Sequence, residues 1–442
     1  MTGALCRMLS LLALLAGVAY GHGAFPDTIG VLAPIDRPHS ILLLTNFGLL
    51  VSIDDGAHWD WACEEAMASL VYAYDQTPPP ASTLLAASTA GPLYSDDRGC
   101  SWHTGGGAIS ALTTNDVFAD ATDSNHVFAI ASRPTDGSTG LTELYESRDS
   151  GLTYARLYTP EVGSLLTGVR SAPSDPLTVY LAERHYNDAG SQFSLLRSLD
   201  GGAHFSSTAL TDVLTQVLGG RRPIAVRIAA VDTQKATSVY LRVSLSGGDS
   251  GTQDALCISD DGGQTFVLAN LFAEPIAALF ERANHSLVAA TSSQTFVSGD
   301  SARSWIPWSA PHIRSLAERE GILYAATDNF ADHFAVASSN DDGVTWRPLL
   351  SFDQIRGLYA CGDIATRCAA PWVELQALFG IGAGDGGTGD GGALPDPIPG
   401  CSCSVGQRAS GSLPAGLFIL VSLFLWWLRK HPLQNRRRDP TV

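Results

Sequence analysis

Short apolar runs alternate with polar turns along most of the chain, and this pattern predicts strands rather than helices. The runs are rich in Val, Leu, Ile and Ala, and Gly, Pro, Asn, Asp or Ser bound them. They come in sets of three, of which the first two read IGVLAPI, SILLLTN, GLLVS and SLVYAYD, STLLAAS, GPLYS. A fourth short run follows each set, so the sequence predicts an all-β fold of repeated four-stranded units.

A polar turn separates the third and fourth runs of each unit. In the first unit it reads VSIDDGAHW, with Ser52, Asp54, Gly56, His58 and Trp59. The pattern Ser-x-Asp-x-Gly-x-(Thr, Ser or His)-aromatic occurs seven times in the sequence, and its aspartates are Asp54, Asp97, Asp149, Asp200, Asp261, Asp300 and Asp341. Successive copies begin 39 to 61 residues apart, which is the spacing typical of propeller blades.

The residue types of the polar turn have a structural explanation. Ser and Asp side chains close a turn by hydrogen bonding to nearby backbone groups, and Gly supplies a positive φ or a close approach. The terminal aromatic residue returns to the sheet and fills space beside the neighbouring unit. The sixth copy has Ala302 in place of Gly, which predicts a somewhat different and strained turn there.

These turns resemble the Asp-box, or BNR, repeat of sialidases, sortilin-type receptors, xyloglucan-cleaving enzymes and photosystem assembly factors. The resemblance implies a seven-bladed β-propeller over residues 22–353. In that superfamily the boxes lie on the outer turns, away from the ligand face. The seven aspartates are therefore expected to be structural.

Both ends of the chain carry targeting signals. Residues 1–21 have one basic residue, an apolar run and a small-x-small site, which predicts a secretory signal peptide. Residues 412–428 form an apolar stretch followed by a basic cluster, which predicts a C-terminal transmembrane helix with its tail in the cytoplasm. The rest of the chain is then expected outside the cell.

The region after the propeller divides into three parts. Residues 354–379 are expected to form a disulfide loop and a short capping helix, and residues 380–400 a linker rich in Gly, Asp and Pro. Residues 401–442 resemble the C-terminal sorting tag of myxobacterial surface proteins, because Cys401 and Cys403 precede the apolar stretch and the basic cluster. The resemblance implies a sorting protease as partner, lipid on one of these cysteines and delivery to the cell surface or outer membrane. A plain single-pass anchor is the alternative.

The other cysteines suggest disulfides, which an exported chain permits. Cys361 and Cys368 are close enough in sequence for a local bridge. Cys63 and Cys100 lie at equivalent edges of successive units and are candidates for a second bridge, although the sequence leaves this pairing open. Cys257 lies in the apolar run ALCIS and is expected to be a buried thiol.

The net charge and the absence of metal-binding motifs reduce the number of partner and cofactor classes to consider. The formal net charge of −17 argues against a nucleic-acid partner, because basic groups to neutralise phosphate are scarce. No spacing of Cys and His suggests zinc or another metal, and no cofactor is expected.

A ligand face is expected on the loops that join the second strand to the third and one blade to the next. Two of these loops, residues 183–192 and 327–333, gather polar side chains that suit sugars or peptides, namely His185, Tyr186, Asn187, Asp188, Asp328, Asn329, Asp332 and His333. Ordinary solvated loops are the plainer explanation of the same residues.

The sequence favours a non-catalytic module, attached to the cell surface, that binds an extracellular glycan or protein. A secreted glycoside hydrolase of sialidase-like or xyloglucanase-like type is the alternative. Arg227, Arg314 and Arg356 begin or precede inner strands, as a sialidase would need, but the Phe/Tyr-Arg-Ile-Pro signature is missing. Asp116 begins an inner strand as a candidate carboxylate, with no partner assignable from sequence.

Overall fold

The structure is a computed structural model, and it describes residues 26–67, 71–133, 141–187, 190–247 and 251–382. The predicted signal peptide, sorting cysteines and transmembrane helix lie outside these ranges, as do residues 383–400 of the predicted linker. Within the described ranges, no helix is both long enough and apolar enough to span a bilayer.

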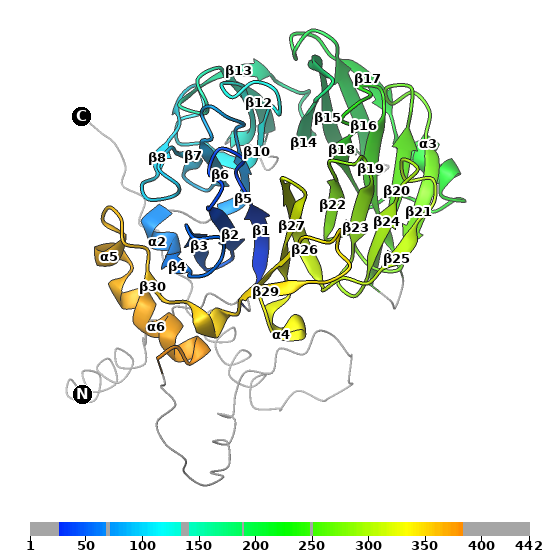
Figure 1. The fold of residues 1–442 in the computed structure, drawn as a ribbon. Coiled ribbons are helices and arrows are strands. Elements are labelled where there is room, and N and C mark those ends of the chain that lie inside the picture. Colours follow the sequence, from blue (N-terminus) through cyan, green and yellow to red (C-terminus); the bar gives the residue numbers. More distant parts are fainter. Residues whose placement is uncertain (1–25, 68–70, 134–140, 188–189, 248–250, 383–442) are drawn as a thin grey trace, which may run out of the picture. The chain divides into compact units, whose positions relative to one another are not determined.

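The described residues form seven antiparallel sheets, each made mainly of four strands that are consecutive in sequence. Figure 1 shows the sheets arranged as the blades of a propeller, with the first strand of each blade innermost. The seven-bladed all-β prediction is therefore confirmed. The first four blades comprise β1 (Thr28–Leu32), β2 (Ile41–Thr45), β3 (Gly48–Ser52) and β4 (Asp60–Ala62); β5 (Val71–Gln76), β6 (Leu84–Ser88), β7 (Gly91–Ser95) and β8 (His103–Thr104); β10 (Thr113–Ala119), β11 (Val127–Arg133), β12 (Leu141–Ser147) and β13 (Thr153–Tyr158); β14 (Ser164–Ala172), β15 (Asp175–Asn187), β16 (Gly190–Ser198) and β17 (Ser206–Ala209). The last three comprise β18 (Ala225–Val231), β19 (Val239–Ser246), β20 (Thr252–Ser259) and β21 (Val267–Phe272); β22 (Ala278–Glu281), β23 (Leu287–Ala290), β24 (Thr295–Ser298) and β25 (Ile306–Trp308); β26 (Ile313–Arg319), β27 (Ile322–Thr327), β28 (Val336–Ser339) and β29 (Arg347–Leu350).

The second and third strands are more deeply buried than the inner strands, although inner-strand residues such as Val169 and Ile313 also belong to the core. Every residue of β2, β3 and β6 is buried, because these strands pack on both faces against neighbouring blades. The inner strand β5 is only partly buried along most of its length, as is β22. This difference leaves space along the propeller axis, and polar and charged side chains of the inner strands can reach it.

The polar turns join the third strand to the fourth in all seven blades and share one hydrogen-bond pattern. In the third blade, Ser147 Oγ donates to Asp149 Oδ1 at 2.7 Å and accepts from Gly151 N at 2.9 Å. Asp149 then accepts from the backbone N and the side-chain Oγ1 of Thr153, at 2.8 and 2.6 Å. Both side chains are thus satisfied inside a seven-residue segment, Ser147 to Thr153, which explains the fixed spacing.

The glycine of the polar turn lies against the preceding blade. A Cβ built on Gly343, at φ +80°, would approach Trp308 to 1.9 Å, and one on Gly202 would approach Leu157 to 2.7 Å. Trp308 and Leu157 each follow the preceding turn's aromatic residue by three positions. The glycine therefore permits both the left-handed backbone and close blade-to-blade packing.

Ala302 occupies the glycine position of the sixth polar turn and keeps the hydrogen-bond pattern of the other copies. Its N–H donates to Ser298 Oγ at 2.9 Å, as in the other copies, although its φ of +65° is unfavourable for a residue with a Cβ. At the position where Trp308 and Leu157 occur in other blades, the preceding blade has Ala269, in the same apolar cluster. A smaller neighbour thus accompanies the extra methyl group. The predicted difference is confined to the backbone angle.

The seventh blade contacts the first through hydrogen bonds to the inner strand β1. Thr28 Oγ1 donates to the carbonyl of Thr327 at 2.7 Å, and Val31 N donates to Ser315 Oγ at 3.4 Å. After β29 the chain passes through a 3-10 turn, η2 (Phe352–Gln354), and adds β30 (Gly357–Leu358) in parallel to β4. The C-terminal tail therefore extends the N-terminal sheet, and this addition ties the two ends of the ring together.

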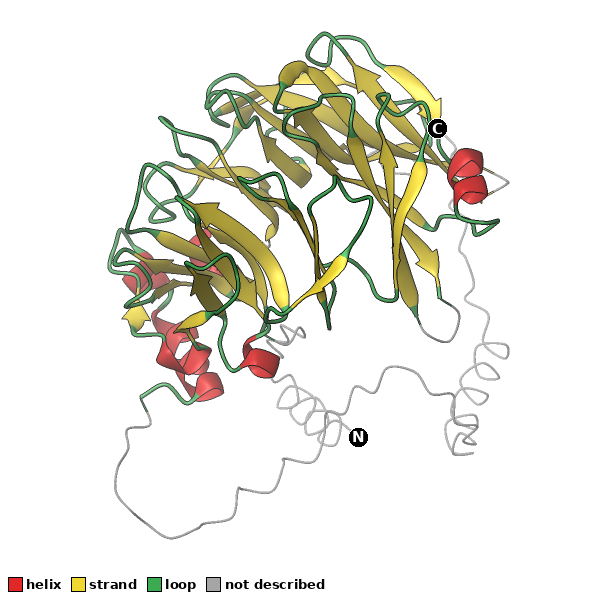
Figure 2. Cartoon of the chain, turned by 45° about the vertical axis from the view of Figure 1, so that its right-hand side comes forward, coloured by secondary structure: helices red, strands yellow, loops and turns green. Residues whose placement is uncertain are grey.

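The tail continues as α5 (Ile364–Arg367) and α6 (Ala369–Phe379), drawn in orange beside the first blade in Figure 1. Trp372 of α6 packs on Trp61, with ring centroids 5.9 Å apart, and Phe379 packs on Phe47 at 5.5 Å. The predicted capping helix thus exists, but it covers the edge of one blade. The remaining described helices are short (Figure 2): α2 (Glu64–Met67), α3 (Thr211–Val217) and α4 (Asn329–Asp332).

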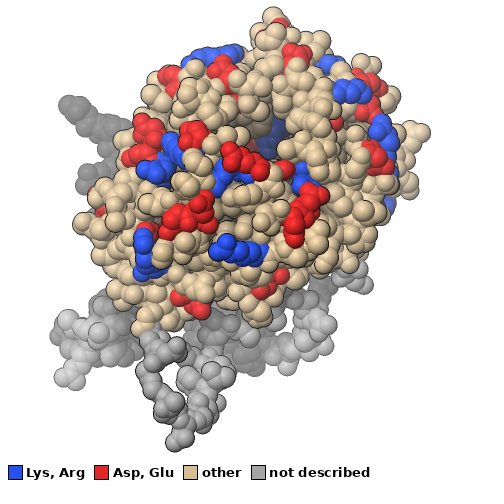
Figure 3. All heavy atoms as spheres, in the orientation of Figure 1, with Lys and Arg blue, Asp and Glu red and all other residues tan. Residues whose placement is uncertain are grey.

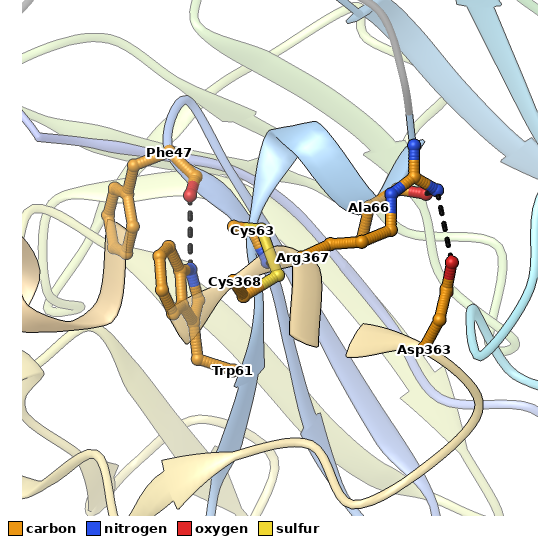
Figure 4. The surroundings of a disulfide bond; sticks show 7 residues. All are labelled: Phe47, Trp61, Cys63, Ala66, Asp363, Arg367 and Cys368. Carbon is orange, nitrogen blue, oxygen red and sulfur yellow. Dashed lines mark hydrogen bonds and ion pairs between the residues drawn. A yellow bond between two sulfur atoms is a disulfide. The ribbon is translucent and has the colours of Figure 1, made fainter. Parts of the chain in front are cut away.

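The predicted disulfide partners were wrong. Cys63 bonds to Cys368, across 305 residues, and Cys100 bonds to Cys361, across 261 residues. The local bridge between Cys361 and Cys368 does not form, because α5 lies between them and each cysteine faces a different blade. Figure 4 shows the Cys63–Cys368 bridge below α2, beside Trp61, whose indole donates to the carbonyl of Phe47.

A second short strand also covers a blade edge. β9 (Gly106–Gly107), in the connection between the second and third blades, pairs in parallel with β13. The buried thiol predicted for Cys257 is confirmed, and burial raises its pKa to about 12.

Candidate functional site

A cavity of about 680 Å³ lies between the inner strands of blades two to five. Its polar and charged lining residues are Tyr72, Asn115, Asp116, Ser132, Thr142, Thr167, Arg170 and Arg227. Most of them lie in the first halves of inner strands or near the turn between the second and third strands. The polar turns occupy the opposite ends of the strands, so the cavity opens on the face expected to bind ligand. In the view of Figure 3 the ring is hollowed, with basic side chains inside the hollow.

Asp116 and Arg170 face each other across the boundary between blades three and four. Arg170 Nη1 lies 3.5 Å from Asp116 Oδ2 and donates to the carbonyl of Val169 at 2.6 Å. The guanidinium also lies 4.9 Å from the ring centroid of Phe118. Burial nevertheless raises the pKa of Asp116, even though the arginine favours the charged form. The strands thus hold Arg170 in place, and its charge only partly offsets the burial of Asp116.

A second carboxylate, Asp75, lies deeper along the same inner strands. Its Oδ2 accepts from the backbone N of Ala119 at 2.8 Å, and its Oδ1 accepts from its neighbour Gln76. Burial raises the pKa of Asp75 to about 6, despite these hydrogen bonds and the positive charge of Arg170. Asp75 is partly exposed. A carboxyl group that faces a narrow channel, with protein on all sides, accounts for both the raised pKa of Asp75 and its partial exposure.

Arg227 is the cation in the cavity lining that can pair with a ligand. Its side chain is exposed, and it lies on β18 at the cavity wall. Its charge favours the ionised form of Asp116. Within the described part of the chain, no hydrogen bond or ion pair holds its guanidinium. Across the cavity, Tyr72 exposes 49% of its surface. The cavity therefore offers a free guanidinium and an accessible aromatic ring.

The arginines considered for a sialidase-like site do not converge. Arg314 Nη2 lies 2.7 Å from Asp328 in the seventh blade, and Arg356 pairs with Asp60 at the outer edge of the first. Arg227 alone of the three lies in the cavity lining. These three arginines therefore do not form the triad that such an enzyme needs.

The predicted ligand loop at residues 183–192 is instead the end of a long hairpin. His185, Tyr186 and Asn187 belong to β15, which pairs with β16 up to Gly190, and Asp188 lies outside the described residues. His185 Nδ1 lies 3.1 Å from Ser164 Oγ, and Tyr186 exposes 46% of its surface beneath the guanidinium of Arg184. Ligand binding by these residues stays a prediction.

The second predicted loop folds around α4 and uses its polar groups locally. Asp328 Oδ1 caps the helix by accepting from the backbone N of Phe330 and of Ala331, at 3.0 and 3.1 Å. Asp332 binds His312, and Asn329 Oδ1 accepts from the backbone N of Phe352 at 3.0 Å. His333 ends the helix at φ +63°. These contacts show structural roles, and a role in binding stays a prediction here too.

Neither predicted loop contributes a residue to the lining of the cavity. Sequence reasoning had singled out Asp116 and Arg227 but missed Tyr72, Asp75 and Arg170. A signal was present, because all five residues interrupt inner-strand runs of small and apolar residues. Their convergence depends on the order of blades around the axis, which no single run reveals.

The structural aspartates differ from the cavity carboxylates in their electrostatics. Hydrogen bonds from the side chain and the backbone of Thr345 lower the pKa of Asp341 to about 2. Among the residues that the structure describes, no cluster of His, Cys, Asp and Glu side chains is arranged to hold a metal ion.

No family model matches the chain, and no curated protein matches it. Among solved structures, 292 chains match. YCF48 from Cyanidioschyzon merolae is 11% identical, covering 68% of this chain and 92% of its own, with a TM-score of 0.44. A GH74 xyloglucanase from Xanthomonas campestris is 15% identical, covering 71% and 77%, with a TM-score of 0.34. The extracellular domain of a putative hybrid two-component system from B. thetaiotaomicron is 14% identical, covering 71% and 38%, with a TM-score of 0.47. At these values the similarity concerns the fold alone.

Proposed function

We propose that the chain is an exported Asp-box β-propeller, anchored at the cell surface, that binds an extracellular ligand without catalysis. The cavity between blades two to five is the binding site, and the ligand that suits it best is a glycan carrying a carboxylate. Export and anchoring rest on the sequences of residues 1–21 and 401–442, with a sorting protease as the partner that processes the tail.

The unpaired guanidinium of Arg227 supports this proposal most directly. The chain carries a net charge of −17, yet the cavity lining contains two arginines and one aspartate. An arginine facing a cavity without a protein partner is suited to bind a carboxylate through two parallel hydrogen bonds. The carboxylate of an acidic ligand would supply the negative charge that pairs with the guanidinium of Arg227.

The rest of the lining suits a sugar. Tyr72 offers an exposed ring against which the apolar face of a pyranose can pack, and Asn115 and Thr167 offer hydrogen-bonding groups for hydroxyls. A protein ligand that presents a carboxylate is the competing occupant.

Affinity measurements with the full chain test this function. We expect an oligosaccharide containing uronic acid to bind more tightly than its neutral counterpart, and Arg227→Met to weaken that binding at least about tenfold, which corresponds to roughly 1.4 kcal/mol. Arg303→Met is the matched control, because Arg303 is exposed in a polar turn on the opposite face. Equal loss in both variants, or tighter binding of acidic peptides than of acidic glycans, would contradict the assignment.

Glycoside hydrolysis at the same cavity is the second candidate, because Asp75 and Asp116 both have raised pKa values. A carboxyl group that stays protonated near neutral pH can act as a general acid. The contacts argue against this role, since Asp116 faces Arg170 and both oxygens of Asp75 accept backbone hydrogen bonds. Release of reducing ends from xyloglucan or sialosides, abolished by Asp116→Asn, would make the protein an enzyme.

A further inference from the structure

The outermost strand of a blade has unpaired backbone groups along one edge, and six of the seven blades protect that edge. β30 covers β4, and β9 covers the start of β13. β8 has two residues, and β17 is a short polar strand with the sequence SSTA. β25 and β29 contain Pro307 and Pro348, which interrupt pairing.

The fifth blade is the exception. Its outer strand, β21, has six residues with the sequence VLANLF, which contains no proline and no charged residue. In the described chain no strand pairs with its outer edge. Val267, Leu268 and Leu271 expose 63, 41 and 44% of their surfaces. Long, uncharged and apolar edges of this kind readily accept another strand.

A bulge in β21 does not protect it. The register with β20 shifts at Ala269, and the same shift occurs where β13 pairs with β12 and where β29 pairs with β28. β13 nevertheless accepts β9 at Thr153 and Tyr154. In this fold, an outer strand that carries a bulge can therefore take an added strand beside the bulge.

We propose that β21 pairs antiparallel with β21 of a second copy, so that two propellers share one eight-stranded sheet. With Ala269 opposite Asn270 of the copy, a twofold axis passes between them. Leu268 then lies opposite Leu271, and Val267 lies opposite Phe272. Each exposed leucine thus finds an apolar partner, which is the requirement for a self-complementary interface.

The proposed strand ladder adds no charge repulsion to the pairing of two copies. Two chains with a net charge of −17 repel each other over most of their surfaces. The paired strands contain no ionisable residue. In this register the next acidic residue, Glu274, lies opposite Thr265 rather than opposite another acid. No like charges meet across the ladder, so it forms without that penalty.

Sedimentation of the full chain over a range of concentrations tests the interface. We expect a monomer–dimer equilibrium that Leu268→Lys weakens at least about tenfold, because the lysine would face Leu271 of the copy. Leu271→Glu should weaken it similarly. The double variant should restore dimerisation, since each lysine would then face a glutamate. Ile306→Lys, on the exposed outer strand of the sixth blade, is the control and should have no effect.

A chain that stays monomeric up to about 100 μM, the highest concentration to be sedimented, would overturn the proposal, as would a dimer that survives either single substitution. Failure of the double variant to recover would exclude the antiparallel register. Circular dichroism checks that each variant is folded. Ligand affinity at the cavity is measured in the same samples, and its loss would concern the proposed binding function rather than this interface.

Discussion

The polar side chains on one face of the propeller repeat in every blade, whereas those on the other face differ from blade to blade. On the face of the polar turns, seven aspartates repeat one arrangement, in which serine, backbone and the residue four positions on satisfy the carboxylate. On the cavity face the symmetry is broken, because Tyr72, Asp116, Arg170 and Arg227 occur once each. Repetition accounts for the fold, and departures from it are where a specific ligand site can arise.

The largest effect should come from disturbing blade packing at a polar turn. Gly343→Ala places a Cβ where Trp308 lies and requires a left-handed backbone, so we expect a loss of about 3 kcal/mol in the free energy of unfolding. Ala302→Gly, at the equivalent position of the sixth blade, should change stability by less than about 1 kcal/mol. Urea unfolding measures both, and similar losses would contradict the packing argument.

Removing a carboxylate should lower stability more on the face of the polar turns than on the cavity face. Asp149→Ala eliminates three hydrogen bonds in a polar turn, and we expect a loss of about 2 kcal/mol in unfolding free energy. Asp116→Ala should change stability by less than about 1 kcal/mol, because burial already disfavours its charge. A cavity variant as unstable as the turn variant would mean that Asp116 is structural too.

The smallest effect is a pH dependence with opposite signs on the two faces. Hydrogen bonds lower the pKa of Asp341 to about 2, so its stabilisation is present above the unfolded value of 3.8 and is lost as pH falls towards 2. Burial raises the pKa of Asp75 to about 6, so this group lowers stability as pH rises from 3.8 to 6.

The titration of His126 should lower stability further as pH rises above 6.5. Burial lowers its pKa, but hydrogen bonds to Asp120 and Glu146 outweigh this and raise it above 6.5. The stability that its proton contributes is present below pH 6.5 and is lost as pH rises through the folded value. We therefore expect the urea midpoint to be highest between about pH 4 and 5. A midpoint that rises steadily from pH 4 to 8 would contradict these assignments.

The tail shows where reasoning from the sequence failed. Cys361 and Cys368 are seven positions apart, and nearness in sequence suggested a bridge between them. The tail instead runs along the first blade as β30, and each cysteine meets a partner more than 250 residues away. Which cysteines meet is decided by the path of the tail over the ring.

The sequence by itself determined the repeated unit, because its contacts are local. The polar turn closes within seven residues, and each blade uses four consecutive strands, so spacing and alternation were enough to predict both. Tertiary structure alone decided the cavity, the disulfide pairs and the exposed edge of β21. The cavity and the disulfides join residues that lie far apart in sequence, and the edge of β21 is open because no other strand of the described chain pairs with it. All three features depend on how the blades and the tail pack together, which no local pattern records.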